Sequence, residues 1–258
     1  MGGAVARGLA QGTLVRASDI CVANPSRGKL DALRKDCPAL RTTTDNREAV
    51  RDADVVLLAV KPWKVKEVVD GIKDGLDYRR QTVASMVGGL GTAELDGFLA
   101  RPGSGELPPV YCIIPNTAIA VRSSMTFLTS VRSSAEADAR MLAVFRELGD
   151  AMLVEERLLN AGMVLASCGI AYAMRYLRAA TEGGVELGMY ARDAQRIVMQ
   201  TMKGAVELLQ ATGSHPEAEI DKVTTPGGLT IRGLNAMEEK GFTTSVIAGL
   251  KASLPTKR

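Results

Sequence analysis

A glycine-rich segment near the end of the chain, Thr224-Thr225-Pro226-Gly227-Gly228, has the residue types of an anion-binding helix start. Threonine is a favourable N-cap, proline suits the first helical turn, and glycines leave the backbone N–H groups unobstructed. Because such amides attract negative charge, a carboxylate could bind here. A capped helix without a ligand explains the same residues, so the segment indicates a carboxylate site only together with other motifs.

A second candidate site lies at the beginning of the chain. Met1-Gly2-Gly3-Ala4 has the residues of the last part of a glycine-rich turn that leads into a helix. In nucleotide-binding α/β domains this turn follows a central strand, and the helix start faces the cofactor pyrophosphate. We therefore expect about ten further residues before Met1, which would form the first strand and a G-x-G-type turn. The alternative is that Met1 is the natural start and that the domain tolerates the missing strand.

The segment Asn24-Pro25-Ser26-Arg27-Gly28-Lys29 bears on the type of nucleotide. It follows a short apolar run, at the place where an acidic residue would bind the ribose 2′-hydroxyl of NAD. Here no carboxylate is present, and there are two cations instead. Because arginine binds phosphate through paired hydrogen bonds, the segment favours NADP(H) over NAD(H). A solvated basic helix start is the alternative, and it explains Lys29 better than Arg27.

Composition argues against several classes of partner and site. The 258 residues carry a net charge of +3, with basic and acidic residues interspersed, which argues against a nucleic-acid partner. The four cysteines form no C-x-x-C pair and the chain has one histidine, so we expect reduced thiols and no metal site. The apolar runs are shorter than a membrane span, and the N-terminus lacks the apolar core of a signal peptide. We therefore expect a cytoplasmic protein without a membrane partner.

These motifs lie in a pattern of alternating strands and helices. The segment 54–60 is mainly apolar after its first residue, as expected of a strand that is covered on both faces. Strands that alternate with helices favour right-handed βαβ units and a mostly parallel sheet. We expect strands at 20–23, 54–60, 82–87, 110–114, 125–129 and 151–155, and helices at 26–35, 64–73, 92–99 and 135–148.

After about residue 155 the pattern becomes entirely helical, with predicted helices at 156–185, 192–212, 216–223, 227–239 and 243–252. We therefore predict an α/β Rossmann-type nucleotide-binding domain over 1–154, with its first strand missing from the sequence, and an all-α domain over 155–258. The apolar helix surface of the second domain exceeds what about 100 residues can cover. We expect this domain to bind the substrate and to form the interface of a homo-oligomer.

Four motifs together resemble the pyrroline-5-carboxylate reductase family over nearly the whole chain. They are Met1–Ala4, Ala59-Val60-Lys61-Pro62, Pro115-Asn116-Thr117 and the most specific one, the run from Asp221 to Ile231. The resemblance implies reduction of 1-pyrroline-5-carboxylate to L-proline by hydride transfer from NADPH, the last step of proline biosynthesis. It also implies a homodimer or higher homo-oligomer with the active site near the dimer interface.

The resemblance further implies roles for individual residues. The hydroxyl of Thr230 would bond the ring nitrogen of the substrate, which makes Thr230 the candidate catalytic residue. Tyr172 could donate a proton, although packing explains a tyrosine between two alanines as well. The cofactor would be NADP(H), with NAD(H) as a second possibility. Substrate contacts would come from Thr225, Gly227, Gly228, Leu229 and Thr230, and cofactor contacts from Met1, Gly2, Gly3, Asn24, Ser26, Arg27, Asn46, Ala59, Val60, Lys61, Pro62, Met86, Val87 and Gly88.

The chain departs from the family pattern in three places. Cys112 stands where the family usually has arginine, and Ala118 where it has proline. The family's S-G-S-G-P-A-Y stretch corresponds to Ala166–Tyr172, which lacks the proline. These departures bear on the geometry around the nicotinamide more than on the reaction.

Two other functions remain open at this point. A β-hydroxyacid dehydrogenase of the same architecture would use a lysine on the first helix of the second domain, but the segment 156–185 contains no lysine. A non-catalytic, oligomeric binding protein on the same fold is the other alternative. The intact segment Thr225–Ile231 argues against it.

Overall fold

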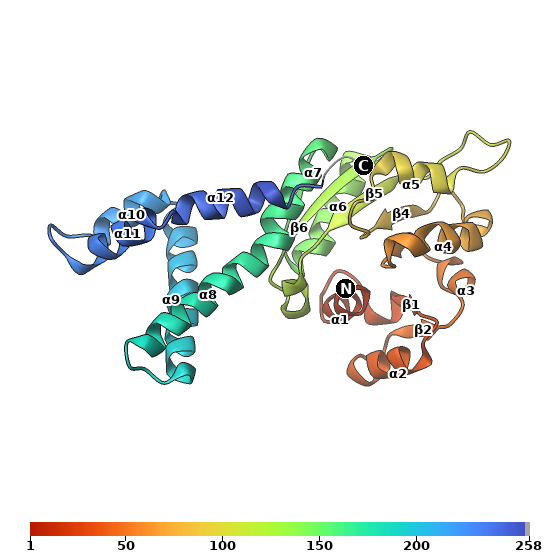
Figure 1. Cartoon of the computed structure of the whole chain (residues 1–258). Coiled ribbons are helices and arrows are strands. Elements are labelled where there is room, and N and C mark those ends of the chain that lie inside the picture. Colours follow the sequence, from red (N-terminus) through yellow and green to blue (C-terminus); the bar gives the residue numbers. More distant parts are fainter. Residues whose placement is uncertain (256–258) are drawn as a thin grey trace. The chain divides into compact units, whose positions relative to one another are not determined.

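The computed structural model describes residues 1–255, which form two compact units (Figure 1). The first unit comprises Met1–Ser167 together with Pro255, and the second comprises Cys168–Leu254. Strands and helices alternate in the first unit, whereas the second unit is helical. The predicted fold class, a Rossmann-type domain followed by an all-α region, is confirmed.

The strands of the first unit form two sheets. Four of the five strand pairs are parallel, and only β5 and β6 run antiparallel. The prediction of a mostly parallel sheet therefore holds. The smaller sheet contains β1 (Cys21–Ala23) and β2 (Arg41–Thr43), and the larger has the order β3 (Val55–Leu58), β4 (Thr82–Ser85), β5 (Val110–Ile114), β6 (Ser124–Val131) and β7 (Gly149–Leu153).

Helices cover both faces of the larger sheet because the apolar side chains of its strands alternate between the two faces. On one face, α4 (Val65–Ile72) and α5 (Thr92–Leu99) pack against β3 and β4. On the other face, α1 (Gly2–Ala10) and α6 (Ala135–Arg146) pack against β5 and β6. The smaller sheet is flanked by α2 (Arg27–Asp36) and by the short α3 (Asn46–Val50).

In the part of the chain that the structure describes, β1 pairs only with β2, and β3 pairs only with β4. All three residues of β1 are half-buried rather than buried, and Val55 at the start of β3 is exposed. The expectation of a strand before Met1 concerns residues outside this sequence and stays a prediction.

The first helix after the sheet, α7 (Glu156–Met163), packs on the first unit. Leu159 and Ala166 lie in one apolar cluster with Ile114 and Phe127. Gly162 allows this close approach, since a Cβ there would come within 2.7 Å of the Phe127 ring. The compact unit therefore continues to Ser167, past the predicted division after residue 154, which marks the point where the chain becomes helical.

The second unit contains five helices in its described residues. These are α8 (Gly169–Glu186), α9 (Ala191–Thr212), α10 (Pro216–Val223), α11 (Leu229–Glu239) and α12 (Phe242–Ala252). Helices α8 and α9 pack closely, because Gly184 would place a Cβ only 2.8 Å from that of Ala194. Ala194 is the one hydrophobic residue that is buried within 168–254. The remaining apolar side chains of this unit are at least partly exposed, as expected of helices that pack against another subunit.

One helical stretch, Glu156–Glu186, is long and apolar enough to cross a membrane by length and composition alone, and 22% of its most apolar window is buried. A π-helical turn, Val164–Cys168, lies within this stretch and separates α7 from α8. The expectation that no membrane binds the protein stays a prediction.

Candidate active site

Most of the predicted cofactor residues of the first unit come shortly after the carboxyl ends of strands. Asn24 follows β1, Asn46 comes shortly after β2, Ala59–Pro62 follow β3, and Met86–Gly88 follow β4. β1 is parallel to β2, and β3 is parallel to β4. The carboxyl ends of the two strands in each pair therefore point the same way. The edge outside the carboxyl ends of parallel strands is where α/β folds bind nucleotides.

The start of α1 lies against the end of β3. A Cβ on Gly2 would come within 2.8 Å of the Cβ of Ala59, so only glycine allows this approach. Met1 is the N-cap residue and makes no side-chain cap, and its carbonyl accepts from the N–H groups of Ala4 and Val5 at 2.8 and 3.1 Å. The first N–H groups of a helix have no partner within the helix. This bare helix start fits the pyrophosphate of a dinucleotide.

The segment after β1 is folded by its own side chains. The N–H of Asn24 donates to the carbonyl of Thr43 at 3.2 Å, and the amide oxygen of Asn24 accepts from the N–H of Ser26 at 2.9 Å. This turn makes Ser26 the N-cap of α2 and Arg27 its first residue. Both side chains are exposed, and no carboxylate occurs between Asn24 and Lys29. Such a surface fits a 2′-phosphate better than a ribose hydroxyl.

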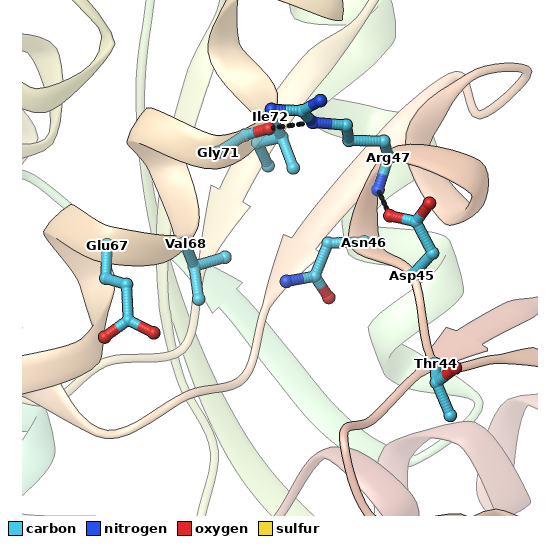
Figure 2. A pocket seen from close by; sticks show the side chains of 8 residues that line it. All are labelled: Thr44, Asp45, Asn46, Arg47, Glu67, Val68, Gly71 and Ile72. Carbon is cyan, nitrogen blue, oxygen red and sulfur yellow. Dashed lines mark hydrogen bonds between the residues drawn. The ribbon is translucent and has the colours of Figure 1, made fainter.

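An open hollow of about 320 Å³ lies between α3 and α4. Figure 2 shows Glu67 and Val68 on one side of it, with Asn46 and Asp45 across from them. The wall near Asn46 is fixed by hydrogen bonds, since the Asp45 carboxylate accepts from the N–H of Arg47 at 2.8 Å. The Arg47 Nε in turn donates to the carbonyl of Gly71 at 2.9 Å. Asn46, which was predicted near the adenosine, is therefore part of a hollow.

The loops after β3 and β4 are held side by side. The N–H of Met86 donates to the carbonyl of Leu58 at 2.9 Å, which extends the β3–β4 pairing by one step. Val87 is buried and its N–H donates to the Ser85 hydroxyl, whereas Gly88 and Lys61 are exposed. The predicted residues 59–62 and 86–88 thus form adjacent parts of one surface.

The segment Pro115-Asn116-Thr117 follows β5 and is tied to the π-helical turn. The side-chain amide of Asn116, which is 8% exposed, donates to the carbonyl of Ala166 at 3.4 Å. Its oxygen accepts from the N–H of Ala118 at 3.0 Å. In return, the Ser167 hydroxyl donates to the carbonyl of Pro115 at 3.1 Å. These hydrogen bonds could not be predicted from the sequence, because nothing in the local pattern indicates a π-helical turn.

Cys112 lies in β5 and belongs to the core of the first unit. Its side chain is buried, and its thiol donates to the carbonyl of Leu90 at 3.4 Å. Burial raises the pKa of Cys112 to about 12, with a smaller contribution from the negative charge of Glu156. The thiol therefore stays neutral and takes the part of a small apolar side chain.

In the second unit, residues 225–228 form a tight turn and not the first turn of a helix. The N–H of Gly228 donates to the carbonyl of Thr225 at 2.9 Å, with Pro226 second and Gly227 third at φ +68°. Helix α11 begins at Leu229, and Gly228 is its N-cap without a side-chain cap. The predicted N-cap role of a threonine is therefore wrong, because glycine at the third position allows a turn that proline at the second favours.

The turn leaves the start of α11 open. A Cβ on Gly228 would come within 2.5 Å of the Thr225 hydroxyl oxygen, so a side chain cannot be added there without moving Thr225. Leu229 is 80% exposed, and Thr230, the second residue of α11, is exposed as well. The predicted substrate residues 225–230 thus form one accessible surface of turn and helix start.

Tyr172 and His215 have structural partners within the second unit. The Tyr172 hydroxyl donates to the carbonyl of Gly249 at 3.2 Å and also pairs with the hydroxyl of Ser253. His215 caps α10 because its Nδ1 accepts from the N–H of Glu217 at 3.2 Å. Neither side chain is needed as a proton donor to explain its position.

Comparisons with known proteins show which family this chain resembles. Residues 156–258 match the family model described as "pyrroline-5-carboxylate reductase dimerisation". Residues 1–88 match the family model described as "NADP oxidoreductase coenzyme F420-dependent". The chain is 34% identical to pyrroline-5-carboxylate reductase 1 of Dictyostelium discoideum over 98% of its own length, and spans about half (47%) of that protein. It is 32% identical to pyrroline-5-carboxylate reductase 2 of the same organism, with 98% of this chain and 87% of the relative covered.

Solved structures show the same similarity. The structure of a pyrroline-5-carboxylate reductase from Coxiella burnetii has a TM-score of 0.87 and 28% sequence identity, with 98% of this chain and 92% of the other covered. The order of a Rossmann-type unit and a helical region is therefore that of a known architecture. The resemblance seen in the sequence is confirmed, and the chain belongs to the pyrroline-5-carboxylate reductase family.

Proposed function

We propose that this chain reduces 1-pyrroline-5-carboxylate to L-proline with NADPH, the last step of proline biosynthesis. The observation that carries the proposal is the open turn at 225–228 before α11, in a chain that also has a bare helix start at Gly2. Membership in the family supports it, since the curated relatives named above are pyrroline-5-carboxylate reductases.

The start of α11 has the chemistry to bind the substrate carboxylate. The N–H groups of Leu229 and Thr230 belong to the first turn of the helix, where no intrahelical carbonyl can accept from them. Gly227 and Gly228 carry no side chain that would screen these amides, and the helix dipole adds a partial positive charge. Together these groups would hold the carboxylate and fix the orientation of the ring.

Thr230 would then bond the ring nitrogen through its hydroxyl group. A cyclic imine that is protonated on nitrogen is already electrophilic at carbon, so the enzyme needs to position it and to exclude water more than to donate a proton. This agrees with Tyr172, whose hydroxyl is engaged by Gly249 and Ser253. The role of Thr230 is thus to hold the nitrogen side of the ring while the ring carbon is reduced.

The cofactor is NADP(H), as the NADP oxidoreductase family match over residues 1–88 supports. When bound, NADPH supplies the hydride for the ring carbon. The start of α1 at Gly2 and Gly3 would hold the pyrophosphate, and Ser26 and Arg27 the 2′-phosphate. The remaining predicted contacts are Met1, Asn24, Asn46, Ala59, Val60, Lys61, Pro62, Met86, Val87 and Gly88.

The protein forms a homo-oligomer through its helical region, which matches the dimerisation family model. Within this proposal the active site lies near the dimer interface. What supports it is that the substrate segment 225–230 falls inside the matched range 156–258, where the helices of one unit bury few of their apolar side chains. We also propose a cytoplasmic location, supported by four unpaired cysteines in residues 1–255.

The test is a spectroscopic assay of the purified protein with NADPH and 1-pyrroline-5-carboxylate. We expect loss of reduced-cofactor absorbance that depends on both compounds. Thr230→Ala should lower kcat/KM for the imine by roughly tenfold or more, since it removes a hydrogen bond to a charged nitrogen. Thr201→Ala is the matched control, because this threonine bonds only the carbonyl of Ile197 in its own helix. A protein that binds NADPH but oxidises none would support a non-catalytic role instead.

A further inference from the structure

The only tryptophan of the chain, Trp63, is exposed beside the cofactor edge of the first unit. It lies two residues after Lys61, at the end of the loop that leaves β3, in a short 3₁₀ turn (Pro62–Lys64) before α4. Its side chain is 75% exposed. Tryptophan is usually among the most buried residues by area. An exposed tryptophan near a ligand-binding edge therefore indicates contact with a ligand.

Trp63 lies just before the helix that forms one wall of the hollow between α3 and α4. The turn Pro62–Lys64 runs directly into α4, and Trp63 precedes Glu67 by four residues in the sequence. Glu67 and Gly71 both line the hollow (Figure 2). Trp63 therefore lies beyond the N-terminal end of α4, in the segment that joins this helix to β3.

The charges around Trp63 fit the adenosine end of a dinucleotide. The Lys61 ammonium group is 6.0 Å from the centre of the indole ring, and the Lys64 ammonium group pairs with Glu67 at 2.6 Å. The indole ring thus lies beside a cation that could bind phosphate, and Lys64 links its turn to Glu67, which lines the hollow that contains Asn46. Flat aromatic rings with adjacent cations are the groups that hold nucleobases by stacking.

We propose that Trp63 stacks on the adenine ring of NADPH at the mouth of the hollow between α3 and α4. This inference rests on the proposed function only in the identity of the cofactor. It adds Trp63 to the cofactor-binding residues predicted from the sequence, and it gives the hollow at Asn46 an occupant, the adenine base.

Because the chain has one tryptophan, its fluorescence reports this site alone. The experiment titrates the full protein with NADPH, with adenosine 2′,5′-bisphosphate and with reduced nicotinamide mononucleotide. We expect quenching by NADPH and by the bisphosphate, because both carry the adenine ring. The bisphosphate is decisive, since it lacks the nicotinamide that could quench indole over a distance by energy transfer.

Substitutions provide the second measurement. Trp63→Ala should raise the KM for NADPH about tenfold and leave kcat unchanged, whereas Trp63→Phe should keep the KM within about threefold. Leu14→Ala, which truncates another exposed apolar side chain of this unit at 58% exposure, is the control and should change neither constant. Trp63 is exposed, so its removal should leave the melting temperature unaltered.

The outcomes separate this inference from the proposed function. If the protein oxidises NADPH while the bisphosphate leaves the fluorescence unchanged and Trp63→Ala keeps a normal KM, the stacking role is wrong and the reductase stands. Quenching by the mononucleotide alone would also overturn it, because Trp63 would then face the nicotinamide. If the bisphosphate quenches but no imine is reduced, the stacking role stands and the proposed reaction fails.

Discussion

Gly2 and Ala59 meet at the cofactor edge, where a Cβ on Gly2 would lie 2.8 Å from the Cβ of Ala59. The contact joins the first turn of α1 to the residue after β3. It sets how closely the helix start approaches the edge at which the strands β3 and β4 end. Glycine is therefore needed at residue 2 because a side chain would not fit there, and not because the backbone has a positive φ.

Gly2→Ala should disturb this contact and weaken cofactor binding. Overpacking of this kind costs about 1–3 kcal/mol, which corresponds to a rise of roughly tenfold in the KM for NADPH. The double variant Gly2→Ala with Ala59→Gly should recover most of the affinity, because it removes the opposing methyl group. Gly97→Ala is the control, since a Cβ there meets nothing within 4 Å. Failure of Ala59→Gly to rescue would show that the contact is not the cause.

Arg27→Ala should weaken NADPH more than NADH. The guanidinium group is at the first position of α2 and exposed, so its contribution to NADPH comes from the 2′-phosphate, which NADH lacks. We expect roughly a tenfold higher dissociation constant for NADPH and little change for NADH, measured by calorimetry. Arg34→Ala, in the same helix but paired with Asp31 at 2.6 Å, should change neither. Equal losses for both cofactors would contradict the assignment.

Asn116→Ala should destabilise the first unit. The substitution leaves the carbonyl of Ala166 and the N–H of Ala118 without their side-chain partner, which costs about 1–3 kcal/mol of unfolding free energy. Ser167→Ala removes the neighbouring tie to Pro115 and should cost less, since the lost partner is a half-buried hydroxyl. Urea unfolding of the three proteins gives these values. If Ser167→Ala lowered the unfolding free energy as much as Asn116→Ala, the Asn116 amide would not be the main hydrogen-bonding group between these segments.

Glu147 should make the stability of the first unit depend on pH. Its carboxylate accepts from the N–H and hydroxyl of Thr13 at 2.5 and 2.7 Å and from the N–H of Leu14. The Thr13 backbone N–H, then the Thr13 hydroxyl, lower the pKa of Glu147 below its usual 4.5. A carboxylate with a lowered pKa stabilises the fold above the unfolded value, and this contribution is lost as pH falls through the folded value.

Glu147→Gln should therefore flatten the acid side of the stability curve. The unfolding free energy of the native protein should decrease from about pH 5 downward, and that of the variant should decrease less over the same range. Chemical unfolding at several pH values measures both curves. Parallel curves for the two proteins would assign the acid sensitivity to other carboxylates.

Strong apolar runs made most of the fold predictable. The strand at 110–114 and the helix at 92–99 have the observed bounds, because a buried strand and a helix with regular apolar spacing both leave clear patterns. β2 was not predicted, since Arg41-Thr42-Thr43 has no apolar pattern, and α3 after it has only five residues. Their conformation depends on pairing with β1 and on packing against α4, which the local sequence does not encode.

The candidate site was predictable only in part. The glycines at 2, 227 and 228 are informative because each position leaves no room for a side chain or has a positive φ, and glycine alone satisfies both. The ties between Asn116 and the π-helical turn depend on residues about 50 positions apart in the chain, so no local pattern could reveal them. No role could be predicted for Trp63 from the sequence. What distinguishes this residue is its exposure, which only the folded structure shows.

The most direct test of the central claim follows the hydride itself. The protein is incubated with 1-pyrroline-5-carboxylate and NADPH that carries deuterium at the transferable position, and the product is analysed by mass spectrometry and NMR. We expect L-proline with one deuterium on the ring carbon that was double-bonded to nitrogen, and little such product from Thr230→Ala. Unlabelled proline, or no proline from a folded protein that binds NADPH, would contradict it.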